Sequence, residues 1–366
     1  MASHRRPTVA VVFGGRSSEH GVSCATAGGV LAAIDRDRWD VVAIGITPAG
    51  RWVPASARAE DWLLRDGSLP SVPHGERTVL PPRDSQERTW RVLEQDGRVS
   101  VLADIDVVSP LLHGPFGEDG TIQGALELVD VRYVGAGVLA SAIGMDKEFM
   151  KTALRGAGLP VTPDVVLQAG ASLDEHRAQI EALGLPVFVK PARAGSSMGI
   201  TKVSTWDGLE PAVAAAVQHD PKVLVERAVV GREIETAVLS TPDGVVASPA
   251  GEIVTSGGRE FYDFDAKYLD QSAVDLRCPT ELAPEVAAQV ADIAVRAFTA
   301  VGSESLARVD VFVSEDGTVT VNEINTMPGF TSTSMYPRMW AAAGVSYPQL
   351  VETLLSGALA RPTGLR

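Results

Sequence analysis

Two acidic residues and an amide lie close to a predicted hairpin near the end of the chain, where their spacing suggests a metal site. The segment SLARVDVFVSEDGTVTVNEINT contains two β-rich runs separated by the dipeptide Asp316-Gly317. Such a dipeptide is typical of a two-residue hairpin turn. If these two residues form the loop, Asp310 lies directly opposite Glu323, and Arg308 lies directly opposite Asn325.

Strand alternation then places Arg308, Asp310, Glu323 and Asn325 on one face of the hairpin. Two carboxylates opposed across a sheet repel each other, so a divalent cation between them is the favoured explanation. Carboxylate and amide oxygens suit Mg²⁺, with phosphate oxygens and water completing its octahedron. Arg308 could meet a developing negative charge. The alternative is a solvent-facing hairpin with a cross-strand Arg–Glu pair.

A loop rich in small residues could hold phosphate. In FVKPARAGSSMG, Lys190 ends an apolar strand, and Gly195 and Gly199 allow backbone N–H groups to approach an anion. Ser196 and Ser197 add hydroxyl donors. The pattern is neither a Walker A loop nor a GxGxxG turn, and a flexible loop without a ligand is the alternative.

Three further residues are weaker candidates. Lys147, in the helical run MDKEFMK, could contact phosphate, although a lone helical lysine is usually solvated. Glu226 ends the apolar strand VLVERAV and could accept a hydrogen bond from an adenine amino group. Glu233, in GREIE, could accept hydrogen bonds from ribose hydroxyls.

The composition indicates an ordinary globular protein of two or three domains. The chain has 366 residues, 45% of them hydrophobic, and a formal net charge of −14. This charge disfavours nucleic acid or an anionic membrane as the main partner. Two cysteines are too few for a disulfide framework, and neither an export signal nor a membrane span is apparent. We therefore expect a cytoplasmic protein.

The elements that position these residues fall into three stretches. The first third alternates strands and helices: strands at 8–13, 40–46 and 104–110, helices at 17–34 and 122–128, and an embellishment at 49–99. This rhythm predicts a parallel sheet covered by helices. A small α+β unit follows, with helices at 147–157, 173–182 and 209–218 and strands at 165–168, 186–190 and 222–227. The last third has strands at 233–239, 245–250, 305–313 and 318–324, a polar loop at 255–268, a helix at 284–301 and C-terminal helices.

Several motifs together resemble the D-alanine–D-alanine ligase family of the ATP-grasp superfamily. They run almost the length of the chain: VFGGRSSEHGVS, LLHGPFGEDGTIQG, GAGVLASAIGMDK, LPVFVKPARAGSSMG, EFYDFDAKY, ARVDVF and NEINTMPGFTSTSMYP. The resemblance implies a mixed α/β and α+β fold, with an N-terminal parallel-sheet (pre-ATP-grasp) domain and the two lobes of an ATP-grasp fold. The corresponding ranges are 1–146 for the N-terminal α/β substrate domain, 147–232 for the small lobe and 233–366 for the lobe with the metal and catalytic residues.

The resemblance also implies a role for individual residues. Glu19 matches the carboxylate that receives the ammonium of the first D-alanine, and His113 matches a histidine near it. The other matches are as follows: phosphate contacts Lys147, Lys190, Ser197 and Lys267; adenine and ribose contacts Glu226, Val229 and Glu233; a loop-closing network of Glu19, Ser196 and Tyr268; Mg²⁺ ligands Asp310, Glu323 and Asn325; oxyanion contacts Arg308 and Gly329; and second-substrate contacts Ser334 and Met335. Asp265 departs from the commoner Glu or Ala of the family, with little expected consequence.

The implied reaction joins two D-alanines for peptidoglycan precursor synthesis. ATP phosphorylates the first carboxylate, and the second amine attacks the acyl phosphate. The resemblance implies two Mg²⁺ ions, for which Mn²⁺ can substitute, and a homodimer. In this family, Tyr at position 268 goes with dipeptide synthesis, whereas Phe or His goes with D-alanine–D-lactate ligases. The expected substrates are D-alanine and ATP.

Other functions remain open from the sequence. Another ATP-grasp carboxylate–amine ligase is the nearest alternative, but it would need other substrate residues at Glu19 and in TSTSMYP, which here fit the D-alanine pattern. A D-alanine–D-lactate ligase is a further alternative, against which Tyr268 argues. An NAD-dependent oxidoreductase would need a GxGxxG turn after the first strand, and the sequence lacks one. A non-catalytic nucleotide-binding regulator would be expected to have lost a metal ligand or Arg308, and all of these are present.

Overall fold

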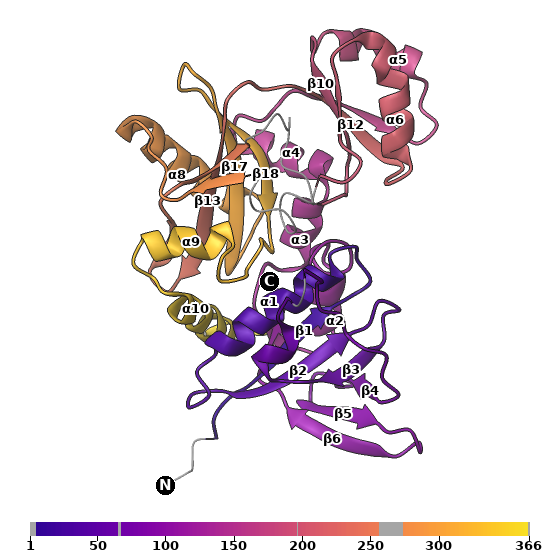
Figure 1. Cartoon of the computed structure of the whole chain (residues 1–366), viewed down its shortest axis with the longest axis vertical. Coiled ribbons are helices and arrows are strands. Elements are labelled where there is room, and N and C mark those ends of the chain that lie inside the picture. The colour runs from indigo at the N-terminus through magenta and orange to yellow at the C-terminus, as the bar shows by residue number, and fades with distance from the viewer. Residues whose placement is uncertain (1–4, 65–66, 196, 256–273, 365–366) are drawn as a thin grey trace.

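The computed structural model describes residues 5–64, 67–195, 197–255 and 274–364. Figure 1 shows three parts: an N-terminal part that holds β1 to β6, a part around β13, β17 and β18, and a small part around β10 and β12. No helix in the described ranges is both long enough and apolar enough to cross a membrane.

The N-terminal part is built on the predicted parallel sheet. Its strand order is β3-β2-β1-β7-β8, with β3 antiparallel to β2 and the other pairs parallel. Every residue of β1 is buried, as expected of a central parallel strand. The elements are β1 (Thr8–Gly14), α1 (His20–Ala33), β2 (Asp40–Ile46), β3 (Trp52–Ala55), β7 (Val107–Pro110), α2 (Thr121–Glu127), β8 (Arg132–Tyr133) and α3 (Val138–Met145).

Part of the embellishment at 49–99 forms a separate small sheet, whereas β3, near its start, belongs to the parallel sheet. Strands β4 (Thr78–Leu80), β5 (Thr89–Leu93) and β6 (Val99–Asp104) pair in sequence order, after the short helix η1 (Ala59–Trp62). The predicted strand at 104–110 is wrong in extent, because β6 ends at Asp104 and β7 begins at Val107. These two strands belong to different sheets.

The small part is a four-stranded sheet of order β11-β10-β12-β9. One face of β10 and β12, with Val187, Val189, Val223 and Val225, packs in a core with residues of α5 and α6. The other face carries Phe188, Lys190 and Glu226. The elements are β9 (Asp164–Gln168), α5 (Leu173–Glu181), β10 (Val187–Pro191), β11 (Thr201–Val203), η2 (Trp206–Gly208), α6 (Leu209–Val217) and β12 (Lys222–Arg227).

The third part is a six-stranded sheet in which β13 pairs with β14, β15 and β17. Its path is β16-β15-β13-β17-β18, and β14 also pairs with β13. Strands β15 and β16 and helix α3 were not predicted from the sequence. The elements are α4 (Lys147–Gly156), β13 (Arg232–Thr241), β14 (Gly244–Ala247), β15 (Gly251–Thr255), β16 (Val274–Arg277), α8 (Pro284–Ala300), β17 (Leu306–Val313), β18 (Val319–Asn325), α9 (Met335–Ala342) and α10 (Tyr347–Ala360).

Two helices pack across the predicted domain boundaries. Helix α4 buries Met150 and Leu154 against the core of α8, β17 and β18, although the sequence groups it with the small lobe. Helix α10, at the end of the chain, buries Leu350 and Leu354 in a core shared with β1 and α1. The division at 146 and 232 therefore remains a prediction, and the N-terminal and third parts share a core.

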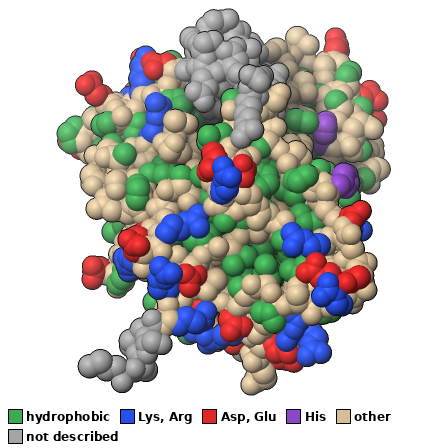
Figure 2. All heavy atoms as spheres, turned by 60° about the horizontal axis from the view of Figure 1, so that its bottom comes forward, with side chains coloured by type: hydrophobic (Ala, Val, Ile, Leu, Met, Phe, Trp, Pro, Cys, Tyr) green, Lys and Arg blue, Asp and Glu red, His purple; other side chains and the backbone are tan. Residues whose placement is uncertain are grey.

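Charged side chains of both signs are interspersed on the face of the molecule drawn in Figure 2. Ion pairs such as Arg5–Asp106, Arg6–Asp40 and Arg38–Glu352 connect distant segments of the chain. Exposed pairs of this kind typically contribute less than about 1 kcal/mol each. The face shows mixed charge rather than a broad basic surface.

Candidate active site

The hairpin of β17 and β18 brings the predicted metal-binding residues together. Asp310 lies opposite Glu323 and Arg308 opposite Asn325, so the predicted register is confirmed. The predicted two-residue turn is wrong, because the backbone N–H of Ser314 donates to Thr318 and leaves a three-residue loop, 315–317. A β-bulge at Asn322 on β18, opposite the step from Asp310 to Val311, restores the register.

Three acidic residues form a row across the sheet. Glu235 on β13 lies opposite Asp310 on one side, and Glu323 lies opposite it on the other. Such a row requires cations nearby, because like charges across strands are destabilising. Arg308 supplies one: its Nε and Nη2 donate to the two oxygens of Asp310, each at 2.7 Å, and Nη2 is 3.3 Å from Glu235.

The surroundings of Arg308 fix its charge. Burial alone would lower the pKa of the guanidinium, but Asp310 and Glu235 raise it well above its ordinary value. Asn325 Nδ2 donates to Asp310 Oδ2 at 2.9 Å, so its amide oxygen faces away from that carboxylate. Arg308 therefore pairs with an acid on its own strand, Asp310, and with one on the neighbouring strand β13, Glu235.

The donor set suits Mg²⁺ that brings other ligands with it. Two carboxylates and an amide provide hard oxygen donors, and Glu323 and Asn325 line an open cavity. Within the described ranges, no group of three or more His, Cys, Asp or Glu side chains is arranged to hold a metal by itself. The residues fit an ion whose remaining ligands are phosphate oxygens and water.

That cavity has a volume of about 590 Å³ and lies where the three parts meet. Its lining includes most of the described candidates predicted from the sequence: Glu19, His113, Lys147, Lys190, Ser197, Arg308, Glu323, Asn325, Gly329, Ser334 and Met335. Asp310, Glu226, Val229 and Glu233 are not part of the lining. Ser196, Lys267 and Tyr268, and most of the predicted loop 255–268, lie outside the described residues.

The two candidate phosphate lysines reach the cavity from different elements. Lys147 is the first residue of α4, where Asp146 caps the helix, and its Nζ donates to the Ala194 carbonyl at 3.0 Å. Lys190 lies on β10, 2.6 Å from Glu226. Burial would lower the pKa of Lys190, but Glu226, Glu323 and Glu233 hold it above its ordinary value.

Glu226 is held by two lysines. Its side chain is 4% exposed and lies 2.5 Å from Lys151 Nζ, on α4, as well as beside Lys190. Burial would raise the pKa of this carboxyl, but the two ammonium groups lower it to about 2. Of the other candidate nucleotide contacts, Val229 is half-buried and Glu233 is exposed. Sequence reasoning missed Lys151, which follows Lys147 by one helical turn.

The N-terminal part contributes a cluster of titratable groups. Glu19 directly precedes α1, and the backbone at Gly114 and Gly195 passes close to it: a Cβ there would lie 2.9 Å and 3.3 Å, respectively, from Glu19 Oε2. The buried His113 contacts the Met327 carbonyl through Nδ1 at 3.2 Å. Burial lowers the pKa of His113, although Glu19 opposes this.

Glu118 is a further acid of this cluster and was not among the ligand-binding residues predicted from the sequence. It accepts a hydrogen bond from the backbone N–H of Gly114 at 2.5 Å. Burial and the nearby carboxylates Glu19 and Glu323 raise the pKa of Glu118 to about 8. The side chain thus holds a proton at neutral pH, which relieves the negative charge around Glu19.

The loop before α9 and the first residue of that helix also line the cavity. Ser334 Oγ accepts from the backbone N–H of Thr331 at 3.1 Å and lies 2.7 Å from its hydroxyl. A Cβ on Gly329 would lie 3.3 Å from the same Oγ, so the backbone approaches closely here. Met335 begins α9 and is 6% exposed.

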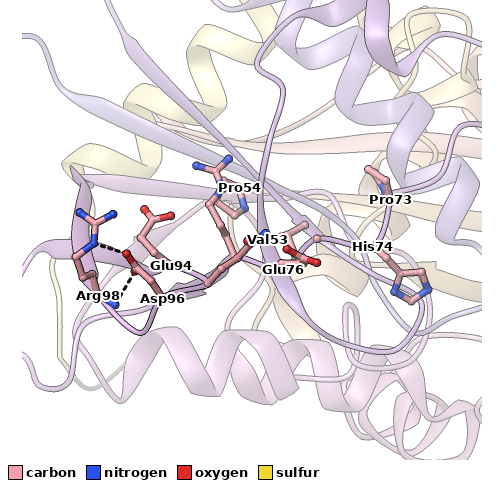
Figure 3. A pocket seen from close by; sticks show the side chains of 11 residues that line it. Val53, Pro54, Pro73, His74, Glu76, Glu94, Asp96 and Arg98 are labelled. Atoms are coloured by element: carbon pink, nitrogen blue, oxygen red, sulfur yellow. Dashed lines mark hydrogen bonds and ion pairs between the residues drawn. The ribbon is translucent and has the colours of Figure 1, made fainter.

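A second hollow, of about 410 Å³, lies in the N-terminal part among β3, residues 73–77 and the turn between β5 and β6. Figure 3 shows Asp96 paired with Arg98 at its edge, with His74 and Glu76 on the other side. None of the residues predicted from the sequence to bind a ligand lines it.

Comparison with known proteins identifies close relatives. The family models described as D-ala D-ala ligase N-terminus and D-ala D-ala ligase C-terminus match residues 8–136 and 153–356. A D-alanine–D-alanine ligase of Kineococcus radiotolerans is 58% identical over the full length of both chains. One from Mycolicibacterium smegmatis is 54% identical over 99% of this chain and 98% of its own.

Solved structures are similar along nearly the whole chain. The D-alanine–D-alanine ligase of Coxiella burnetii has a TM-score of 0.82 at 32% identity and covers 97% of this chain and 94% of its own. VanG D-Ala:D-Ser ligase of Enterococcus faecalis also has a TM-score of 0.82, at 33% identity, covering 97% and 100%. The same architecture therefore accompanies different second substrates.

Proposed function

Because this chain belongs to the D-alanine–D-alanine ligase family, we propose that it joins two D-alanines in an ATP-dependent reaction. The fold is the ATP-grasp fold of that family, and ATP is the nucleotide. The observation that carries this proposal is that one cavity is lined by Lys147, Lys190, Arg308, Glu323 and Asn325. It gathers phosphate-binding cations and oxygen donors beside one another.

The reaction begins with activation of a carboxylate. A carboxylate oxygen of the first D-alanine attacks the terminal phosphorus of ATP, the bond from that phosphorus to the bridging oxygen breaks, and ADP leaves. The amine of the second D-alanine then attacks the acyl carbon and loses a proton, and phosphate departs with the carboxylate oxygen. The product is D-alanyl-D-alanine.

Lys147 and Lys190 neutralise the nucleotide phosphates, with Ser197 and Lys267 as further contacts. Phosphoryl transfer depends mainly on positioning and charge neutralisation, which lysines provide. Glu226, Val229 and Glu233 are the proposed adenine and ribose contacts, from the end of β12 and the start of β13.

Two Mg²⁺ ions, which Mn²⁺ could replace, would be held by Asp310, Glu323 and Asn325. Divalent cations of this kind neutralise charge on the transferring phosphoryl group. The row of carboxylates across β13, β17 and β18 supports this assignment, because it concentrates negative charge where a cation can reach it.

The first D-alanine binds near Glu19, which accepts from its ammonium group, with His113 beside it. Arg308 and the backbone N–H of Gly329 stabilise the oxyanion that forms when the amine attacks; the loss of one such donor typically costs about 10²–10³ in rate. Ser334 and Met335 contact the second D-alanine. Ser196 and Tyr268 would close the site together with Glu19, since an exposed acyl phosphate would hydrolyse.

Tyr268 favours an amine over a hydroxyl as the second nucleophile. The test is ATP turnover with D-alanine, L-alanine, D-serine and D-lactate, followed by measurement of product mass. We expect stimulation by D-alanine and a dipeptide product. Preferential formation of the D-alanine–D-lactate ester across neutral pH would instead support a depsipeptide ligase, and stimulation by none of the four would overturn the proposal.

The wider setting follows from this activity. The dipeptide would serve peptidoglycan precursor synthesis, and hence cell wall biogenesis and cell shape. The need of the reaction for ATP argues for a cytoplasmic location. The net charge of −14 argues against nucleic acid and anionic membranes as partners. A homodimer is proposed by analogy with the family; sedimentation or light scattering tests it.

A further inference from the structure

Helix α4 places two cations, the buried Lys151 and the exposed Arg155, against strands β9 and β12 of the sheet that carries Lys190. Lys151 and Arg155 lie four residues apart and therefore on the same face of the helix. The side chain of Lys151 is 1% exposed, which is rare for a lysine. A buried cation of this kind requires compensating acids.

Those acids are a directly opposed pair on neighbouring strands. Asp164 on β9 lies opposite Glu226 on β12, and their side chains are 3% and 4% exposed. Lys151 Nζ lies 2.5 Å from Glu226 and 3.5 Å from Asp164, and donates to the Thr162 carbonyl at 3.0 Å. Arg155 pairs with Asp164.

Without Lys190, the positive and negative charges of this cluster are equal in number. The two carboxylates of Asp164 and Glu226 face the cations Lys151 and Arg155 from α4, and Lys190 adds a third positive charge on the side of the cavity. If Lys190 turns towards a nucleotide phosphate, Asp164 and Glu226 remain neutralised by the other two. Without Lys151, the departure of Lys190 would leave Glu226 buried without a cation, which is strongly unfavourable.

We propose that Lys151 is a positioning residue for nucleotide binding: it neutralises Glu226 so that Lys190 can exchange its carboxylate partner for phosphate. This inference rests on the proposed ATP-dependent function. It assigns a purpose to a buried lysine that touches neither the cavity nor any predicted substrate contact other than Glu226.

The test compares three single variants and one double variant. Lys151→Met removes the charge with little change in side-chain volume, and Lys151→Arg retains the charge. Arg155→Met is the matched control, because it removes a cation of the same cluster that pairs with Asp164 and not with Glu226. The double variant Lys151→Met/Glu226→Gln removes the carboxylate that would otherwise retain Lys190.

We expect Lys151→Met to raise the KM for ATP at least about tenfold, with kcat and the KM for D-alanine changing much less, as loss of uniform binding predicts. The Kd of ADP, measured by calorimetry, should rise in parallel. Lys151→Arg should recover most of the affinity. The double variant should bind ADP more tightly than Lys151→Met but less tightly than the wild type, because Glu226 is also a proposed adenine contact. Arg155→Met should weaken binding less than Lys151→Met, because Arg155 pairs with Asp164, which also lies 3.5 Å from Lys151. Thermal denaturation identifies any variant that fails to fold. If Lys151→Met does not fold, the double variant, which lacks both buried charges, is compared with the wild type instead.

Unchanged ADP affinity in folded Lys151→Met would overturn the proposal. So would a double variant as weak as Lys151→Met, since Glu226 would then not be the residue through which Lys151 acts. Failure of the proposed function would be visible separately, as a wild-type protein without D-alanine-dependent ATP turnover.

Discussion

Arg308 donates to both carboxylate oxygens of Asp310, two residues further along the same strand, at 2.7 Å. The arginine proposed to stabilise an oxyanion therefore neutralises a proposed metal ligand when no substrate is bound. Both roles require Arg308 to exchange partners as ligands enter, because a cation at Asp310 competes with the guanidinium for the same oxygens.

The first prediction concerns the guanidinium of Arg308. Arg308→Ala should lower kcat by about 10²–10³, the usual cost of removing an oxyanion donor. Arg308→Lys should restore the charge but only part of the rate, because an ammonium group lacks the planar, two-point geometry. Arg296→Ala, at an exposed position on α8, is the control. Steady-state kinetics near wild-type values in Arg308→Ala would refute the assignment.

Substitution of the metal ligands should change the magnesium dependence. We expect Asp310→Asn and Glu323→Gln to raise the Mg²⁺ concentration for half-maximal activity by at least about tenfold. Glu315→Gln, on the exposed loop of the same hairpin, should leave it unchanged. Titration of activity with Mg²⁺ checks this, and curves that coincide for all three variants would exclude these residues as ligands.

Glu118 should make the stability of the ligand-free protein depend on pH. Its folded-state pKa of about 8 lies above the ordinary value of 4.5, so the folded protein retains a proton that the unfolded chain has released. The stabilisation is fully present below pH 4.5 and is lost as the pH rises through about 8. Between pH 6 and pH 9, the Tm of Glu118→Gln should therefore fall less than that of the wild type. Thermal denaturation at a series of pH values measures this difference. Parallel curves for both proteins would contradict the assigned pKa.

The C-terminal helix should be essential for the N-terminal core. Leu350 is fully buried among residues of α1 and β1, so Leu350→Ala should cost about 2–5 kcal/mol in the free energy of unfolding. Leu128→Ala, at a residue that is 83% exposed, should cost less than about 0.5 kcal/mol. Urea denaturation of both variants gives the comparison. Equal losses in the free energy of unfolding would show that Leu350 contributes no more to stability than an exposed residue.

Elements with strong periodicity or clear boundaries could be predicted from the sequence. Strands β2 and β12 agree with the predicted ranges, and the helices at 147–157, 209–218 and 284–301 agree to within one residue at each end. Helix α3 was missed because VLASAIGM is almost wholly apolar and shows no polar face. The short β16 begins at the edge of the described residues, a few residues after the predicted polar loop at 255–268.

The hairpin shows how a correct register can follow from an incorrect turn. Asp316-Gly317 indicated a reversal, but no local signal distinguishes a two-residue from a three-residue loop here. The longer loop shifts the pairing by one residue and the bulge at Asn322 shifts it back, so Asp310 still faces Glu323. Lys151 could not be found in this way, because its burial depends on β9 and β12, which are distant in sequence.

The central claim is that the first carboxylate is activated by phosphorylation, and oxygen transfer tests it most directly. D-alanine labelled with ¹⁸O in its carboxylate is incubated with the enzyme, ATP and Mg²⁺, and the released phosphate is examined by mass spectrometry. An acyl phosphate predicts that each phosphate carries one oxygen from D-alanine, in step with the dipeptide formed. Dipeptide formation with unlabelled phosphate would contradict the account.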